Sequence, residues 1–431
     1  MSFFQTVIGI TIFVLAYFFI ISGKVHRTIA AILGGMLMIV LKIIPQDSAF
    51  SFVDWNVIFL LIGMMIIVAV LGKTGLFQYL AVKSAKMARG DPYLIMAFLI
   101  FITAFFSAFL DNVTTVVFIA PVSILIAKEL GISPTPFLIS EAVASNIGGT
   151  ATLIGDPPNI MIGSAAHISF LSFIKNVSPP IVIMLVLLPF IMKRLMRDKM
   201  TVSYQRKAKI MEFDTSRIIQ NSALLRRTLI VFALVVAGFF IHEYIDLEVA
   251  TIAIIGAFVL ILSMPSQKDA LKELFSQIEW TSLFFFIGFF IMVGGLIELG
   301  VIKAIASKLA EIFHNSILFG SLFTVWLSGF LSAVFDNIPF VATMIPVIKD
   351  IGTQMSYQGI NPLWWALSLG ACLGGNMTLI GAAANVVVAD ISDKNGYRFS
   401  FWEFTKYGFV ITIINLSIAS FYIWLRYLIL I

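Results

Sequence analysis

The sequence has a single cysteine and few charged residues. Cys372 is the only cysteine among 431 residues, which excludes an intramolecular disulfide and a thiolate cluster built within one chain. Charged residues make up 12% of the chain, while the hydrophobic fraction is 60% and the mean hydropathy is +1.02. A typical soluble domain has about twice that share of charge. We therefore expect a polytopic membrane protein.

Motifs of common catalytic sites are also missing. The sequence contains no phosphate-binding loop and no nucleophile elbow. The stretch His242-Glu243-Tyr244-Ile245-Asp246 fails as a zinc motif because Asp stands where the second His is required. We expect no enzyme activity, no cofactor and no metal site. Energy for any work must then come from an ion gradient or from a partner ATPase subunit.

Long apolar runs predict the membrane spans. The run Phe3–Ile21 has neither a basic leading segment nor a small-residue cleavage site, so we expect a spanning helix there and not a cleaved signal. In each half we expect five spans. They are Phe3–Ile21, Ile29–Ile44, Val57–Leu71, Phe137–Ser164 and Ile181–Met196, then Leu229–Ile241, Val249–Met264, Ser282–Leu296, Leu363–Val388 and Phe409–Ile431.

Two more apolar segments, 93–128 and 317–348, have polar residues in the middle and predict re-entrant hairpins. In the first, Ser107 to Thr115 separates two arms that we expect to be half-length helices. A single kinked helix, or two full spans, is the alternative. Residues 73–89 have the pattern of an amphipathic helix at the membrane interface.

The second half of the sequence repeats the first. Trp55 and Trp280, and likewise Asp111 and Asp336, are 225 residues apart, and Gly149 and Gly375 are 226 apart. This spacing predicts an internal repeat. We divide the chain into a first repeat (1–200), a linker (201–226) and a second repeat (227–431).

The number of spans and the basic residues predict how the repeats are oriented. Because five is odd, the second repeat enters the membrane upside down. The linker is rich in Lys and Arg, so it should be cytoplasmic, and both termini should then be extracytoplasmic. Lys and Arg gather in a few loops, so the net charge of +5 needs no nucleic-acid partner. The expected fold is an all-α polytopic membrane protein with two inverted-topology repeats, each of about five transmembrane helices plus one re-entrant hairpin.

One span in each repeat should be a broken helix, at 137–164 and 363–388. Both contain Gly, and the first contains Pro157 and Pro158. Freed backbone at membrane depth persists only where it is buried in protein or lines a wet cavity. We therefore expect the breaks in these two spans and the tips of the two hairpins to form one substrate site. The predicted substrate-binding residues are Asn112, Thr114, Thr115, Asn146, Gly148, Gly149, Thr150, Thr152, Asn159, Asn337, Gly375, Asn376, Thr378 and Asn385.

Carboxylates within the apolar segments are candidates for proton or ion coupling. Asp111 and Asp336 stand at the hairpin tips, where we expect a coupling role and capping of the next helix is the alternative. Asp156 is either a carrier of protons or cations or a cap before the two prolines that follow it. Glu141 and Glu298 fit either a relay or a helix–helix hydrogen bond.

The cysteine aligns with Asn146 in the repeat. A thiol there would suit a soft metalloid, but one thiol cannot chelate it, and a small residue packed at a helix crossing is the preferred interpretation of Cys372.

The motifs Asn146–Asn159, Asp111–Thr115 and Asp336–Pro339 resemble the ion transporter superfamily. The closest likeness is to the group of ArsB-type arsenite permeases, NhaD-type sodium/proton antiporters and the P protein. The resemblance implies two inverted repeats, each with a scaffold part and a transport part, and a substrate site lined by the tips and the breaks. It also implies dimerisation through the scaffold as one option.

The hairpin tips distinguish this chain within the superfamily. Sodium-coupled carboxylate carriers have Ser-Asn-Thr at both tips, whereas this chain has Asp-Asn, which disfavours an anionic substrate. A length of 431 residues without extra domains resembles ArsB permeases. We therefore expect export of arsenite or antimonite as the neutral hydroxide in exchange for protons, carried by Asp111, Asp156 or Asp336. The alternative is a sodium/proton antiporter, and a sodium-coupled anion carrier is less favoured. The expected location is the cell inner membrane.

Overall fold

The computed structural model describes residues 3–22, 24–215, 218–264, 267–313, 316–354 and 361–429. Linker residues 216–217 and the end of the predicted span 409–431 lie outside the described residues. Every regular element in the described ranges is a helix, and nine of these helices are long and apolar enough to cross a membrane. The predicted all-α polytopic fold is confirmed.

The same sequence of elements occurs twice. The first half contains α1 (Phe3–Ser22), α2 (Arg27–Val40), the short α3 (Gln46–Ala49), α4 (Trp55–Lys73), α5 (Leu76–Met87), α6 (Pro92–Phe109), α7 (Asn112–Leu130), α8 (Thr135–Thr150), α9 (Pro157–Ala166) and α10 (Phe170–Leu195). After α11 (Tyr204–Met211) in the linker, the second half contains α12 (Ser222–Ile241), α13 (Val249–Leu262), α14 (Gln267–Ser276), α15 (Trp280–Glu298), α16 (Val301–Ile312), α17 (Ile317–Val334), α18 (Asn337–Gln354), α19 (Asn361–Gly374), α20 (Ala383–Lys394) and α21 (Phe401–Trp424).

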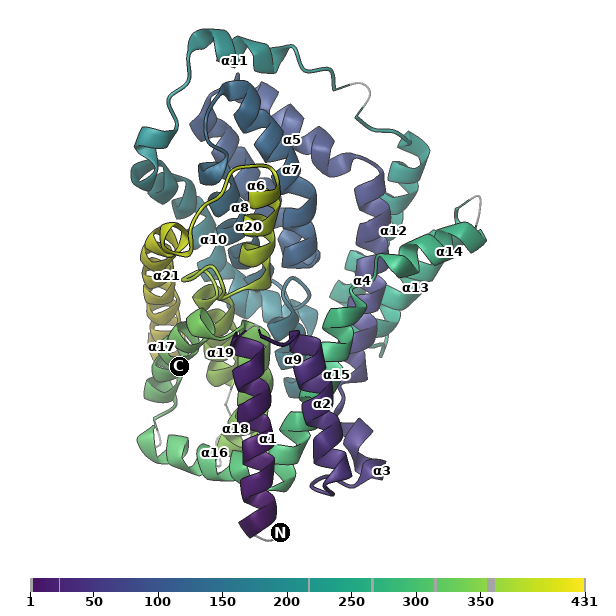
Figure 1. Ribbon diagram of the computed structural model, residues 1–431, viewed down its shortest axis with the longest axis vertical. Coiled ribbons are helices and arrows are strands. Elements are labelled where there is room, and N and C mark those ends of the chain that lie inside the picture. The colour runs from purple at the N-terminus through teal and green to yellow at the C-terminus, as the bar shows by residue number, and fades with distance from the viewer. Residues whose placement is uncertain are drawn as a thin grey trace.

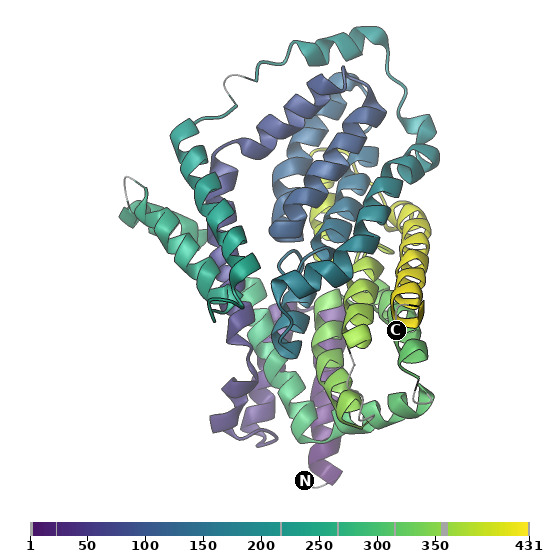
Figure 2. The ribbon, with the colours of Figure 1, turned by 180° about the vertical axis from the view of Figure 1, so that it is seen from behind.

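The two halves point in opposite directions and exchange helices. Figures 1 and 2 show α5 to α8 in the upper part of the molecule and α16 to α18 in the lower part. The helix pair α1–α2 packs on α15 of the other half, and α12–α13 packs on α4. Each half therefore supplies part of the framework that surrounds the other. The linker with α11 lies across the end of the molecule formed by α5 and α7 (Figure 1).

The hairpin arms are longer than the half-length helices expected from the sequence. Helices α6, α7, α17 and α18 have 18, 19, 18 and 18 residues, about 27 Å each at 1.5 Å per residue. The reason is that the polar tips are very short. Leu110 is extended and the Asp111 side chain accepts a hydrogen bond from Thr114 N at 3.0 Å, so α7 starts at once. Phe335 is extended in the same way in the second hairpin.

Both predicted broken helices are interrupted as expected. The first break separates α8 from α9, and the second separates α19 from α20. Asn159 Nδ2 donates to the carbonyls of Gly149, Thr150 and Thr152 at 3.3, 3.3 and 3.0 Å. In the second break, Asn385 Nδ2 donates to the carbonyls of Gly375 and Thr378 at 2.8 and 3.0 Å. The repeated asparagines therefore satisfy the carbonyls that the missing helical turns leave free.

The helices next to the breaks approach the hairpins very closely. A Cβ atom on Gly148 would lie 2.3 Å from the carbonyl oxygen of Ala104 in α6. Its repeat partner Gly374 would meet the carbonyl oxygen of Gly329 in α17 at the same distance. Only glycine allows this backbone contact, which explains why the pair recurs in the sequence.

Candidate substrate and coupling site

Asp156 lies where both hairpin tips meet the first break. Asn112 Nδ2 donates to Asp156 Oδ1 at 3.3 Å, and Asn337 Nδ2 donates to Asp156 Oδ2 at 3.2 Å. The Asp156 side chain is 1% exposed and makes no capping hydrogen bond to α9, although it precedes that helix. The capping interpretation therefore does not describe its side chain, which joins the tips of the two repeats.

Carboxamides continue this network across the repeat boundary. Asn146, in α8, accepts from Asn112 Nδ2 at 3.2 Å. Its own Nδ2 donates to Asn376 Oδ1 at 2.9 Å and to Asn385 Oδ1 at 3.0 Å. Asn376 is fully buried, and its Nδ2 has no hydrogen-bond partner in the part of the chain that the structure describes. Asp156 and five of the predicted asparagines thus form one buried polar cluster, and Nδ2 of Asn376 is its free donor. The asparagines are Asn112, Asn146, Asn337, Asn376 and Asn385.

The hydroxyl groups of the predicted threonines bond to Asp111 or to backbone carbonyls, and not to the carboxamide side chains of this cluster. The hydroxyls of Thr114 and Thr115 bond to Asp111, and the Thr150 hydroxyl donates to the carbonyl of Asn146 at 2.7 Å. The hydroxyl of Thr152 donates to the carbonyl of Ala108, and that of Thr378 to the carbonyl of Ala333. The last two bonds are repeat-related and tie each break to its hairpin.

The predicted glycines act through their backbones. Gly148 packs against α6, and Gly149 and Gly375 pack against Gly155 and Gly381 of their own breaks. No side chain there can contact a solute, so these positions shape the site by allowing close packing.

Asp111 combines capping with a place at a small central cavity. Its carboxylate caps α7, as the capping interpretation predicted. A cavity of about 30 Å³ beside the tips is lined by Asp111, Asp156 and Glu279, together with Asn337 and Arg27. Glu279 precedes α15 and was missed in the sequence, since it appears there as an ordinary residue at the end of a loop.

Arg27 was the second omission. Its Nη1 lies 2.9 Å from Asp336 Oδ2, its Nη2 lies 3.4 Å from Ser282 Oγ, and its guanidinium stacks 5.4 Å from the ring centre of Phe285. In the sequence, Arg27 stands far from both tips, in the loop between the first two predicted spans. Asp336 therefore has a cation partner, whereas Asp156 has none among the described residues.

Cys372 packs against the polar cluster. Its Sγ donates to Asn159 Oδ1 at 3.4 Å, and Ser368 Oγ donates to the same oxygen at 2.7 Å. The thiol is fully buried, as a small residue at a helix crossing would be. Within the described ranges, no group of three His, Cys, Asp or Glu side chains is arranged to hold a metal ion.

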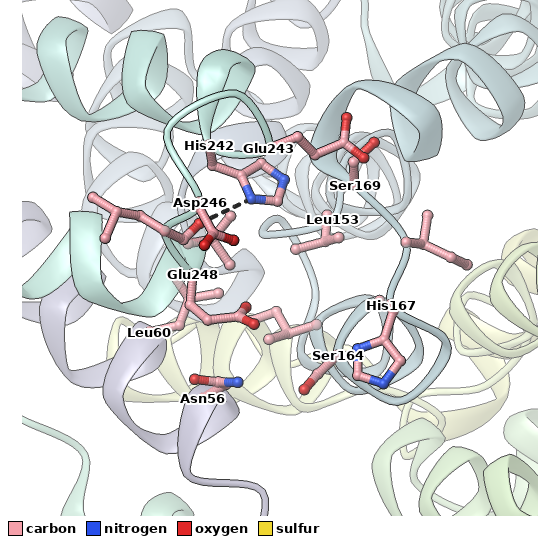
Figure 3. A pocket seen from close by; sticks show the side chains of 15 residues that line it. Asn56, Leu60, Leu153, Ser164, His167, Ser169, His242, Glu243, Asp246 and Glu248 are labelled. Atoms are coloured by element: carbon pink, nitrogen blue, oxygen red, sulfur yellow. Dashed lines mark hydrogen bonds between the residues drawn. The ribbon is translucent and has the colours of Figure 1, made fainter.

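A larger cavity of about 410 Å³ lies at the far end of α9, between the start of α4 and the α12–α13 loop (Figure 3). His242 lies on its wall, with Nδ1 3.1 Å from the carbonyl of Leu247 and Nε2 accepting from Phe170 N at 3.3 Å. The ring thus joins the α12–α13 loop to the start of α10. Leu153 of the first break also lines this cavity, so the cavity lies beside that break.

An all-helical fold with two broken helices, and a polar cluster buried among apolar helices, define a multi-pass membrane transporter. The comparisons with known proteins identify its family. Residues 17–370 match the citrate transporter family CitMHS, and the chain belongs to this family. The resemblance to the superfamily that includes the P protein is confirmed.

Several relatives are similar over the whole chain. An uncharacterized transporter of Mycobacterium tuberculosis is 42% identical over 431 residues, covering 99% of this chain and 100% of that protein. The P protein of Mus musculus is 31% identical over 508 residues, covering 99% of this chain and 61% of that protein.

Two solved structures share the fold. The YdaH transporter of Alcanivorax borkumensis has a TM-score of 0.63 at 15% identity, covering 88% of each chain. The MtrF structure from Neisseria gonorrhoeae, described as an antimetabolite efflux pump, has a TM-score of 0.63 at 11% identity, covering 91% of this chain and 84% of that one.

Proposed function

We propose that this chain exports trivalent arsenic or antimony as the uncharged hydroxide in exchange for protons. The observation that carries the proposal is the cluster around Asp156. One carboxylate without a cation partner is surrounded by carboxamides that both donate and accept hydrogen bonds. Such a carboxylate is suited to bind a proton, and carboxamides are suited to bind hydroxyl groups.

The charges around the central cavity argue against free citrate, the substrate in the family's description. Asp111, Asp156 and Glu279 line the cavity, and its cation, Arg27, is paired with Asp336. Two like charges 4 Å apart repel by roughly 1–4 kcal/mol at effective dielectric constants between 80 and 20. A trianion would meet several such repulsions, whereas an uncharged hydroxide would meet none.

Sodium/proton antiport is the second candidate, and the same acidic cavity favours it. Against it stand the carbonyls of the two breaks. Those of Gly149, Thr152, Gly375 and Thr378 accept hydrogen bonds from Asn159 or Asn385, so they are less available as sodium ligands.

The orientation that we propose follows the basic residues. The linker (201–226) is cytoplasmic, both termini are extracytoplasmic, and the protein lies in the cell inner membrane. A homodimer and an ATPase partner subunit stay predictions.

The test is transport by purified protein in lipid vesicles under an imposed pH gradient, with protein-free vesicles as the control. We expect the gradient to drive arsenite or antimonite movement in the wild type, and Asp156→Asn to abolish that drive. Gradient-driven movement of citrate would refute arsenite export and indicate an anion carrier. Gradient-driven movement of sodium, without any effect of arsenite, would refute it and indicate sodium/proton antiport. In cells, a strain whose own arsenite exporter is deleted should tolerate more arsenite when it expresses this chain than when it does not.

A further inference from the structure

Glu141 is a buried carboxylate that the central cluster does not use. It lies in α8 and is 0% exposed, and its Oε2 has no hydrogen-bond partner among the described residues. Its Oε1 accepts from the hydroxyl of Ser123 in α7. Glu298, the other intramembrane glutamate noted in the sequence, is exposed at the end of α15. The structure therefore separates two residues that looked alike in the sequence.

Within the described ranges, no positive charge forms an ion pair with Glu141. The charged residues on the helices that pack against α8 are Lys128 and Glu129 in α7, Lys175, Lys193 and Arg194 in α10, and Asp390, Asp393 and Lys394 in α20. None of them makes an ion pair with Glu141 in the described part of the chain. A buried carboxylate with neither a cation nor a full set of hydrogen bonds is expensive to keep charged.

Ser123 can serve both protonation states of Glu141. When Glu141 is charged, the serine hydroxyl donates to the carboxylate. When Glu141 has bound a proton, its new O–H can donate to Ser123 Oγ, and the serine hydroxyl turns to the carbonyl of Ile119, which lies 3.3 Å away. Each donor then has an acceptor in both states.

The position of Glu141 links one face of the protein to the site. It lies six residues, about 9 Å, from the start of α8. The linker residue Arg206 packs against Gly131, which ends α7 shortly before α8 begins. Ser145 is one helical turn further on, and its hydroxyl donates to the carbonyl of Asn112 at 2.8 Å. Asn112 in turn contacts Asp156.

We propose that Glu141 is a proton-binding site on the route between the face covered by the linker and Asp156. A proton from a hydronium ion at the face covered by the linker converts the Glu141 carboxylate to the acid, and its onward transfer to the Asp156 carboxylate restores the Glu141 carboxylate. The role rests on the proton coupling proposed above.

Infrared spectroscopy of purified protein tests the proton site without requiring transport. Spectra recorded across a pH series should contain a protonated-carboxyl band that disappears in Glu141→Gln and remains in the control Glu298→Gln. In Ser123→Ala the band should shift, because its hydrogen-bond partner is gone. A spectrum in which Glu141→Gln removes no carboxyl band would overturn the proposal, even if the wild type transports arsenite.

Transport in vesicles tests the relay. Glu141→Gln should slow gradient-driven transport at least tenfold while solute-for-solute exchange, which needs no net proton movement, continues. Equal rates of gradient-driven transport in Glu141→Gln and Glu298→Gln would refute the relay. If Glu141→Gln does not fold, Ser123→Ala decides the question, since an unshifted band in that variant would contradict the site.

Discussion

Asn146 and Asn376 are neighbours in the polar cluster, yet their truncation to alanine should have different consequences. The Asn146 carboxamide takes part in three hydrogen bonds, to Asn112, Asn376 and Asn385. The Asn376 carboxamide takes part in one, and its Nδ2 is buried without a partner.

The difference can be expressed in energy. A typical buried hydrogen bond contributes about 1 kcal/mol net, so Asn146→Ala should cost about 3 kcal/mol of stability. Asn376→Ala loses one such hydrogen bond. It also removes a buried donor without a partner, and burying that donor lowers the stability of the wild type by about 1–3 kcal/mol. Its net effect on stability should be close to zero. If the free donor binds a hydroxyl of the solute, its loss should weaken solute binding about tenfold, because 1.4 kcal/mol corresponds to a factor of ten.

The assay is thermal unfolding of purified protein in detergent, without solute and over a series of arsenite concentrations. We expect Asn146→Ala to unfold at a clearly lower temperature. Asn376→Ala should unfold near the wild-type temperature but need about ten times more arsenite for the same stabilisation. Equal destabilisation by the two variants would refute the assignment of hydrogen bonds, and unchanged arsenite stabilisation in Asn376→Ala would refute the role of the free donor.

Three further predictions concern the framework of the site. Arg27→Gln should lower the stability by about 2 kcal/mol, because it breaks the charged hydrogen bond to Asp336. In a double-mutant cycle, the same substitution should have no such effect in an Asp336→Asn background. Gly148→Ala should lower the stability by about 1–3 kcal/mol, because the new Cβ meets backbone atoms. Gly238→Ala should lower it less, because the new Cβ there meets a side-chain methyl group. Thermal unfolding of the two variants measures the difference. Partial burial raises the pKa of Asp91, but the neighbouring lysine of the linker and the amides of α6 outweigh it and hold that pKa below its usual value. The stabilisation from Asp91 should therefore be complete at neutral pH and be lost as the pH falls below about 4, and Asp91→Asn should remove that part of the acid dependence of unfolding.

Predictions from the sequence were most accurate where the cause is local. Apolar runs predicted where the long helices lie, and Trp55 and Trp280 begin α4 and α15 of the two repeats. The breaks followed from glycine and proline, whose backbone preferences do not depend on distant residues. The arms of the hairpins were predicted too short, because the sequence did not reveal that one extended residue and one capping Asp suffice to turn the chain.

Tertiary structure alone decided which polar groups have partners. The sequence offered Asp111, Asp156 and Asp336 as candidate carriers, and only the packing of α2 on α15 brings Arg27 to Asp336. The carboxamide network likewise needs both breaks to meet, from residues 230 and 239 positions apart. Hydropathy and backbone preference act over a few residues and can be read along the chain. Charge compensation and hydrogen-bond partners depend on distances in space, which only the folded arrangement of helices sets.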